Sequence, residues 1–392
     1  MNAKLFLLAL GTFAASTEAF MIAGILQPIA RDLNVSIFSA GQFVTVFSLT
    51  YAIGSPILAT LTGNWERRRL LAVAMLIFAI GNLICGLADS YTGFMVGRVI
   101  ASIGAAIFVP TASTTASVLA KPEQRGRALA IVIGGQTIAL ATGVPLGAWM
   151  AQAFHWQTAF WLVTLLALIA ALLIRLRFPV LAPQEVPSLR KRVAVAAQPN
   201  IGNALLMTLL WACGAFTFYT YVSNTFINLG AAESTITLVL LIWGITSFFG
   251  SSLGGYASDK IGTHRTLSLV LTCSALLLIG LSVLAGSSPF SGAVTVGMIL
   301  MAVYGCCLWA YIPTQQSRLV TLGGKSAGVV ISLNASAIYL GSAGGAYIGG
   351  LIVNHGLVET LGYFGGGGML LTLLVYTLGH LNRRDASKVA SD

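Results

Sequence analysis

Charged side chains are scarce in this sequence. Asp, Glu, Lys and Arg make up 8% of its 392 residues, whereas a soluble globular domain carries about 25%. Hydrophobic residues account for 57%, and the mean hydropathy is +0.88. Such a chain lacks the polar residues needed to cover a water-exposed surface. The composition therefore predicts an integral membrane protein.

Motifs that mark common enzymes are also missing. The sequence has no GxxxxGK[ST] run for nucleotide phosphates. No Ser–His–Asp set and no metal-ligand spacing stands out. The five cysteines all fall in apolar stretches, where cysteine packs as a small hydrophobic residue. We expect a protein that is not an enzyme, with no metal site and no organic cofactor.

Long apolar runs dominate the chain instead. A helix needs about 20 apolar residues to cross a bilayer. We count twelve such stretches: 4–28, 39–61, 69–89, 92–117, 127–150, 158–178, 200–222, 235–257, 266–286, 291–314, 327–353 and 360–381. The longer connection at 179–199 contains four prolines and the basic run 190–192. The pattern predicts an all-α membrane protein of twelve transmembrane helices. We expect two six-helix bundles, 1–178 and 200–392, joined by a cytoplasmic linker at 179–199.

The basic residues test this count. With the N-terminus inside, 19 of the 21 Lys and Arg fall on cytoplasmic segments, Arg31 falls outside and Arg98 lies within a span. This is a strong positive-inside bias, and one missed span would scatter it. We expect both termini in the cytoplasm. The net charge of +10 then orients the chain against anionic membrane lipid, and it does not require a nucleic-acid partner.

An internal repeat relates the two halves. At an offset of 198 residues, Arg67 aligns with Arg265, Arg127 with Lys325, Gln136 with Asn334, Gly143 with Gly341 and Gly147 with Gly345. Six spans per half give both halves the same orientation, so the halves are pseudo-symmetric parallel repeats. Transporters built this way hold substrate between the halves near the midplane. The repeat fails at Glu18 and Arg98, which align with Phe216 and Val296.

Glu18 and Arg98 are the two intramembrane charges. Glu18 lies roughly 15 Å and Arg98 roughly 10 Å from the outer ends of their helices, at 1.5 Å per residue. A charge at the bilayer centre costs at least about 3 kcal/mol. One interpretation is that Glu18 binds and releases a coupling proton, because burial favours the neutral acid and a nearby cation favours the carboxylate. The other is a static ion pair, although desolvation offsets most of the attraction in such pairs. Arg98 could hold Glu18, tune its protonation, or bind an anionic or hydroxylated substrate.

Several motifs carry a family resemblance over essentially the whole chain. They are GGYASDKIGTHR (254–265), GRVIASIGAA (97–106), GVPLG (143–147), TEAFMIAGILQPIARDL (17–33) and NASAIYLGSAGGAYIGG (334–350). The chain resembles the major facilitator superfamily, and within it the twelve-helix drug/proton antiporters of the bacterial sugar, purine and multidrug efflux branch. GNWERRR (63–69) is a degenerate copy of the first motif, with Gly63 in place of its Asp and Glu66 in place of its second Gly.

The resemblance implies a location and a gate. It implies a multi-pass protein of a bacterial-type inner (plasma) membrane, acting as a monomer. A cytoplasmic gating latch would involve Gly255, Asp259, Lys260 and Arg265, with a solvated loop cluster as the alternative. Pro145, also a gating candidate, would kink the fifth helix and allow tight packing of the two halves, or serve only as part of a packing seam.

Amides and aromatic residues supply the candidate substrate contacts. They are Gln136, Asn334, Phe218, Tyr219, Trp309 and Tyr311. Amides suit hydroxyl or purine edges but also join helices in membranes. The aromatic rings could stack on a flat ligand or face lipid. The sequence does not choose between these interpretations.

The function we expect is a proton-coupled secondary active exporter of a small organic molecule that is drug-, sugar- or purine-like, working by alternating access. The proton is the coupling ion. A passive facilitator of a small polar solute is one alternative. A non-transporting membrane sensor is another, although no sizeable extramembrane domain is present through which it could signal.

Overall fold

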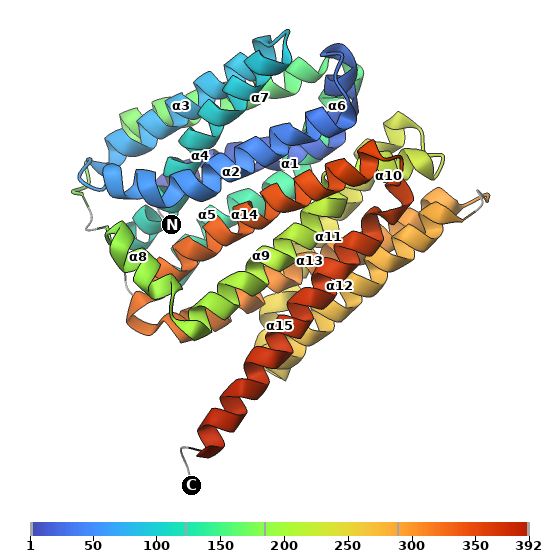
Figure 1. Ribbon diagram of the computed structural model, residues 1–392. Helices are drawn as coiled ribbons and strands as arrows, with labels where there is room; N and C mark the ends of the chain where they lie inside the picture. The colour runs from blue at the N-terminus through green and yellow to red at the C-terminus, as the bar shows by residue number, and fades with distance from the viewer. Residues whose placement is uncertain (1–2, 122–123, 184–185, 288–289, 390–392) are drawn as a thin grey trace.

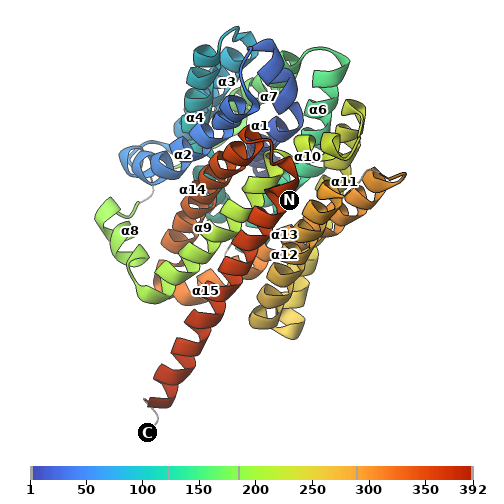
Figure 2. The same cartoon turned by 45° about the vertical axis from the view of Figure 1, so that its right-hand side comes forward.

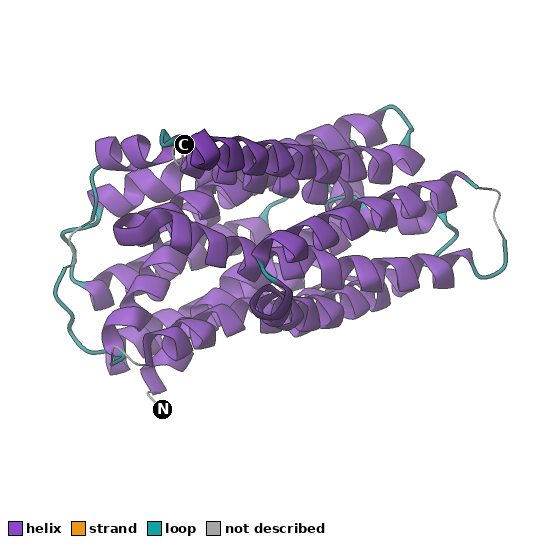
Figure 3. Ribbon diagram, turned by 90° about the horizontal axis from the view of Figure 1, so that it is seen from below, coloured by secondary structure: helices purple, strands orange, loops and turns teal. Residues whose placement is uncertain are grey.

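The computed structural model describes residues 3–121, 124–183, 186–287 and 290–389, the last ten of these by their backbone only. Within these ranges the chain is helical and contains no strand (Figure 3). This is the expected outcome in lipid, where a helix satisfies its own backbone hydrogen bonds.

The helices before the linker form one group, drawn in blue and green in Figure 1. They are α1 (Ala3–Asp32), α2 (Ile37–Leu61), α3 (Arg67–Leu87), α4 (Tyr91–Leu119), α5 (Arg125–Ile138), the π-helical turn η2 (Ala139–Gly143), α6 (Val144–Ala153) and α7 (Trp156–Arg177). Because α5, η2 and α6 follow one another without a break, they make a single pass. We call this set the first group.

The helices after the linker form a second group. They are α9 (Pro199–Tyr219), α10 (Val222–Asn228), α11 (Glu233–Ile261), α12 (Thr263–Gly286), α13 (Ala293–Gly323), η3 (Gly324–Ser326), α14 (Ala327–Asn354), η4 (Val358–Thr360) and α15 (Leu361–Val389). Helix α8 (Leu189–Ala196) belongs to the linker between the groups.

Eleven stretches of the described chain are long and apolar enough to span a membrane. One of them, Ala293–Asn354, has 62 residues and contains both α13 and α14, which are joined by the short turn η3. At 1.5 Å per residue this stretch is about three times longer than one crossing requires. Counting its two helices separately gives twelve passes, which confirms the all-helical membrane fold predicted from the sequence.

The two groups meet along two seams. Helix α14 packs on α2, and α11 packs on η2 and α6. Figures 1 and 2 show α14 lying between α2 and α9. At the second seam, a methyl group on Gly244 would lie 2.0 Å from the carbonyl oxygen of Leu140. Glycine is therefore required for the close approach of the helices there.

The linker attaches to the first group at one end of the bundle, which we call the linker end; the opposite end is the far end. Glu66 accepts hydrogen bonds from the N–H groups of Arg68 (2.8 Å), Arg69 (3.0 Å) and Leu181 (3.1 Å). Burial acts to raise the pKa of Glu66, but the backbone donors and the Arg68 charge outweigh it and lower the pKa. The degenerate loop therefore caps α3 and holds the linker.

The linker also contacts the second group, through Arg192. This side chain donates to Ser332 Oγ on α14 at 2.8 Å and to the carbonyl of Pro187 at 3.2 Å. Helix α8 is thereby fixed against the linker end of α14. Any relative movement of the two groups must strain or rearrange these attachments.

Hydrogen bonds between the groups close the far end. Tyr219 donates to the carbonyl of Phe20 (3.0 Å), Ser223 to that of Ala23 (2.6 Å) and Gln152 to that of Glu233 (2.7 Å), and Arg31 pairs with the Glu233 carboxylate. Each bond lies in the half of the bundle away from the linker. The structure is therefore a state closed at the far end.

Candidate functional site

The two intramembrane charges form a buried ion pair. Glu18 Oε1 of α1 contacts Arg98 Nη1 of α4, and neither side chain is exposed. Arg98 Nε donates to the carbonyl of Phe43 on α2 at 3.1 Å. Its guanidinium carbon also lies 4.3 Å from the centroid of the Phe47 ring. The arginine is thus held by α2 while its outer nitrogen reaches the acid on α1.

Part of this pair has no hydrogen-bond partner. Among the described residues, nothing bonds to Glu18 Oε2 or to Arg98 Nη2. Leaving charged groups unsatisfied in a dry interior is costly, so the pair is a poor choice for a purely structural role. A carboxylate held by one cation can accept a proton on its second oxygen without breaking other bonds.

Small residues let the fifth pass lie close to α1, the helix that contains Glu18. A methyl group on Gly143 would lie 2.1 Å from Thr17 Oγ1, and one on Gly147 would lie 3.0 Å from Met21 Sδ. Pro145 lies in the first turn of α6, inside the continuous pass, where it provides no N–H donor to the preceding turn. The π-helical turn η2 comes directly before it and packs against Thr17, the neighbour of Glu18 in the sequence.

A tyrosine of the second group approaches the pair from across the seam. Tyr339 of α14 stacks on Tyr51 of α2, with ring centroids 3.7 Å apart and an interplanar angle of 22°. Its ring is also 6.4 Å from that of Phe47, the residue under the Arg98 guanidinium. The ion pair is thus linked to the second group through aromatic contacts.

An aromatic cluster surrounds Phe20, two residues beyond the buried acid on α1. The Phe20 ring centroid lies 6.0 Å from Phe216, 6.0 Å from Tyr219, 6.4 Å from Trp243 and 5.8 Å from Trp309. Tyr219 and Trp243 stack at 4.4 Å. We call these five residues the Phe20 cage. Four of its rings come from the second group, and Phe20 alone comes from the first.

Asn334 belongs to a different cluster, within the second group. Its Oδ1 accepts from Thr208 Oγ1 at 2.7 Å, and Gln315 Nε2 donates to the same hydroxyl at 3.2 Å. Beside them Tyr311 stacks on Trp211, with centroids 4.5 Å apart and planes 12° apart. In this state the Asn334 amide joins α14 to α9, as interhelical amides do in membranes.

The last two candidate contacts are Gln136 and Phe218. Gln136 is half-buried on α5. Phe218 is fully buried and packs edge-on against Tyr304, with centroids 6.1 Å apart. Of the six predicted substrate contacts, the structure therefore brings Tyr219 and Trp309 together around Phe20, and Asn334 and Tyr311 together around Thr208.

Comparison with known proteins identifies the family. A sequence profile of the Major Facilitator Superfamily matches residues 8–346. The chain belongs to the major facilitator superfamily. The uncharacterized MFS-type transporter YbcL of Bacillus subtilis is 33% identical, over 96% of this chain and 95% of its own. The inner membrane transport protein YdhP of Escherichia coli K12 is 29% identical, over 91% and 90%. A chloramphenicol resistance protein of Streptomyces lividans is 28% identical, over the same shares.

A solved structure shows the same fold. A bacterial homologue of the human lysosomal transporter Spinster, in an inward-facing and unoccupied conformation, superimposes with a TM-score of 0.70 at 16% identity. The match covers 96% of this chain and 94% of the homologue. This major facilitator chain is therefore a multi-pass membrane transporter and not an enzyme.

The predicted gating residues of this superfamily member lie at the junction of α11 and α12. Gly255, Asp259 and Lys260 are in the last turns of α11, and Arg265 begins α12 after Gly262, which adopts φ +87°. Asp259, Lys260 and Arg265 are exposed. No salt bridge connects them to another residue in the described ranges. Their role as a latch stays a prediction, and the latch is not engaged in this state.

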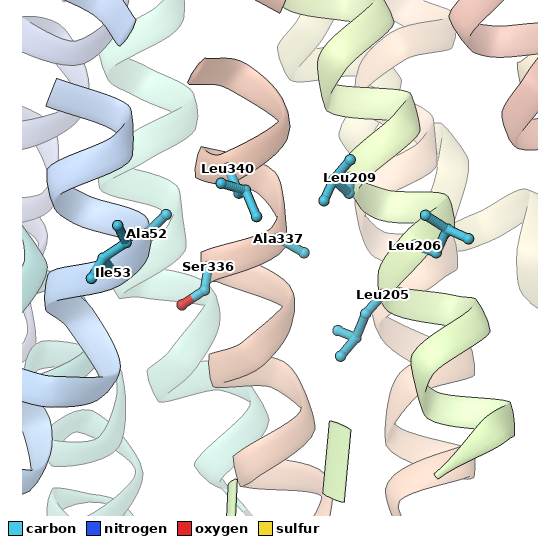
Figure 4. A pocket seen from close by; sticks show the side chains of 8 residues that line it. All are labelled: Ala52, Ile53, Leu205, Leu206, Leu209, Ser336, Ala337 and Leu340. Atoms are coloured by element: carbon cyan, nitrogen blue, oxygen red, sulfur yellow. The ribbon is translucent and has the colours of Figure 1, made fainter. Parts of the chain in front are cut away.

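Two apolar cavities open between helices of the described chain. A groove of about 360 Å³ runs between α2, α9 and α14 (Figure 4). Its lining is Ala52, Ile53, Leu205, Leu206, Leu209, Ser336, Ala337 and Leu340. A second depression of about 480 Å³ lies between α9, α14 and α15. Both are lined mainly by apolar side chains, and neither contains the ion pair or the cage.

Sequence reasoning missed Phe20, Trp243 and Tyr339. Phe20 carried one usable signal, its position two residues from Glu18. Tyr339 lies inside the quoted motif at 334–350, five residues after the amide that was selected. Trp243 carried none, because apolar residues occupy all faces of its helix.

Proposed function

We propose that this protein is a proton-coupled exporter of a small organic molecule, of the drug/proton antiporter type. The observation that supports it is the buried pair of Glu18 and Arg98 at the middle of the bundle. The second carboxylate oxygen of Glu18, Oε2, has no hydrogen-bond partner among the described residues and can accept a proton. A membrane interior keeps such a charge only at a substantial cost. A role in carrying a proton accounts for that cost, and a static role does not.

The proposed cycle uses both ends of the bundle. The basic linker end would face the cytoplasm, so the closed far end would face outward. When the linker end is open, Glu18 is ionised and paired with Arg98, having released its proton inward, and substrate binds. Opening of the far end releases substrate, and Glu18 then takes up a proton from outside.

The movement itself is proposed to be a rocking of two bundles, residues 1–178 and 200–392, on the linker 179–199. The closely packed seams of α2 with α14 and of α11 with η2 and α6 would serve as contact surfaces. The gating residues at the α11–α12 junction would engage only when the linker end closes, which is consistent with their exposure here.

Energetics and relatives support export of this kind. One charge moved through 100 mV supplies about 2.3 kcal/mol, which sustains a concentration ratio of about forty at 1.4 kcal/mol per tenfold. The relative from Streptomyces lividans is named for chloramphenicol resistance, an outcome that efflux of the antibiotic would give.

The test is transport by Glu18→Gln in proteoliposomes, with chloramphenicol as the probe and an imposed proton gradient. We expect the variant to lose gradient-driven accumulation while its melting temperature and downhill exchange stay close to those of the unmodified protein. Asp89→Asn is the matched control, because Asp89 is an exposed acid in the turn between α3 and α4. Accumulation by Glu18→Gln equal to that of the unmodified protein would refute the assignment. Transport by the unmodified protein that ignores the gradient would indicate a facilitator.

A further inference from the structure

Two buried indole N–H groups in the Phe20 cage have no partner. Trp243 is 1% exposed and Trp309 is 7% exposed, and neither Nε1 has a hydrogen-bond acceptor among the described residues. Two other tryptophans show the contrast. Trp156 Nε1 donates to Asp32 at 2.8 Å and Trp161 Nε1 donates to the carbonyl of Gly86 at 3.0 Å. Both tryptophans of the cage are buried without such an acceptor in the described chain.

The chemistry of these donors limits what the cage can bind. An indole N–H donates and never accepts, so a matching ligand must present acceptor atoms. The two rings are close together, with centroids 6.2 Å apart and planes at 74°. One molecule of drug size can therefore reach both. A ligand without an acceptor binds more weakly, because it leaves the buried indole N–H without the hydrogen bond that would offset the loss of water.

The charges near the cage limit the ligand further. Glu18 and Phe20 are two positions apart on α1, so their side chains leave the helix on different faces. A cation could stack on the aromatic rings of the cage, but it would leave both indole N–H groups unmatched. An uncharged ligand that carries acceptor atoms avoids this penalty.

We propose that the Phe20 cage binds an uncharged, flat molecule with hydrogen-bond acceptors, such as nitro, carbonyl or amide oxygens, to which Trp243 and Trp309 donate. The proposal rests on the transport function proposed above and assigns its substrate class. Neither Trp243 nor Phe20 was among the residues selected from the sequence.

The cage is built so that the movement of the groups changes it. Phe20 is its one ring from the first group, and Tyr219 fixes that residue by donating to the Phe20 carbonyl at 3.0 Å. Opening of the far end must withdraw Phe20 from the four remaining rings, and this movement gives a flat ligand stacked on them a path outward. Phe20 thus acts as a lid between the cage and the far end.

The first experiment measures binding to the purified full-length protein in detergent, without a gradient. Chloramphenicol is the uncharged probe, and ethidium is a flat cationic probe. We expect chloramphenicol to bind more tightly than ethidium. We also expect Trp243→Phe and Trp309→Phe each to weaken its binding about tenfold, the loss of one hydrogen bond, with ethidium unaffected. Trp149→Phe, at a half-exposed position on α6, is the matched control and should bind as the unmodified protein does.

A second measurement needs no substitution. Ultraviolet resonance Raman spectra report the hydrogen bonding of indole N–H groups, and chloramphenicol should move part of the signal toward the bonded form. Tighter binding of ethidium, full binding by both cage variants, or an unchanged indole signal would each overturn the proposal.

The proposal and the transport function fail in different ways. Binding that depends on the two tryptophans, combined with transport that ignores protons, would retain the cage and reject the coupling. Exchange of one proton for an uncharged molecule also moves one net charge. Chloramphenicol transport should therefore respond to membrane potential, and a potential-independent exchange in proteoliposomes would contradict it.

Discussion

Replacing Arg98 by methionine should destabilise the protein strongly. The change removes the only cation that contacts Glu18 in the described structure, together with the bond to the Phe43 carbonyl and the contact with the Phe47 ring. Removing one member of a buried pair costs about 3–5 kcal/mol, because the remaining charge stays buried and unpaired. The loss should be largest at alkaline pH, where Glu18 remains ionised, and should shrink toward acid pH as the carboxylate takes up a proton.

The double variant Glu18→Gln/Arg98→Met separates the pair from simple packing loss. Replacement of both charges by neutral groups of similar volume is often neutral or stabilising, so the double variant should recover most of the stability lost in Arg98→Met. Steric trapping in bilayer discs measures the free energy of unfolding for each variant, and the cycle gives the coupling energy. An Arg98→Met protein as stable as the unmodified one at alkaline pH would refute the reasoning. A double variant no more stable than Arg98→Met would refute it as well.

Three further outcomes are expected at other positions. Gly143→Ala should cost about 1–3 kcal/mol through overpacking against α1 and should slow transport, whereas Gly134→Ala, with open space around its α-carbon, should melt no lower than the unmodified protein. Glu66→Gln should make the linker amides exchange with deuterium faster than in the unmodified protein at neutral pH. Since the pKa of Glu66 is lowered on folding, its contribution is present above the usual value near 4.5 and is lost as pH falls through the lowered value. The two proteins should therefore exchange equally in acid, and a difference that persists there would contradict the cap. Cysteines replacing Arg31 and Glu233, in a background without the native cysteines, should form a crosslink that stops transport until a reductant is added. Transport by the crosslinked protein would show that the far end need not open.

The sequence predicted the fold well because few physical forces determine it. The scarcity of charged residues indicated a membrane protein, and the length of the apolar runs gave the number of helices. The placement of the basic residues indicated that this number is even. Lipid allows only helices and closed β-barrels to span it, and apolar runs of about 20 residues select the helix. The bounds agree closely; the stretch expected at 39–61, for example, is α2 at Ile37–Leu61.

The candidate site was only partly predictable. Glu18 and Arg98 stood out because charge inside an apolar run is rare, and their partnership needed only that two helices meet at similar depth. The partners of the aromatic residues could not be found in the same way. Trp243 and Phe20 lie on helices that are apolar all round, so periodicity does not show which face turns inward. Similarly, Asn334 was identified from the repeat, but its partner Thr208 comes from helix packing that no local pattern encodes.

The account depends most on whether Glu18 changes its protonation as the bundle alternates. Difference infrared spectroscopy can follow its carboxyl stretch, with Glu18→Gln to assign the band. The comparison would use protein crosslinked at the far end and protein held open there by a state-specific binder. We predict an ionised carboxylate in the closed form and a protonated acid in the open form. An unchanged carboxyl band in both forms over the accessible pH range would contradict coupled export.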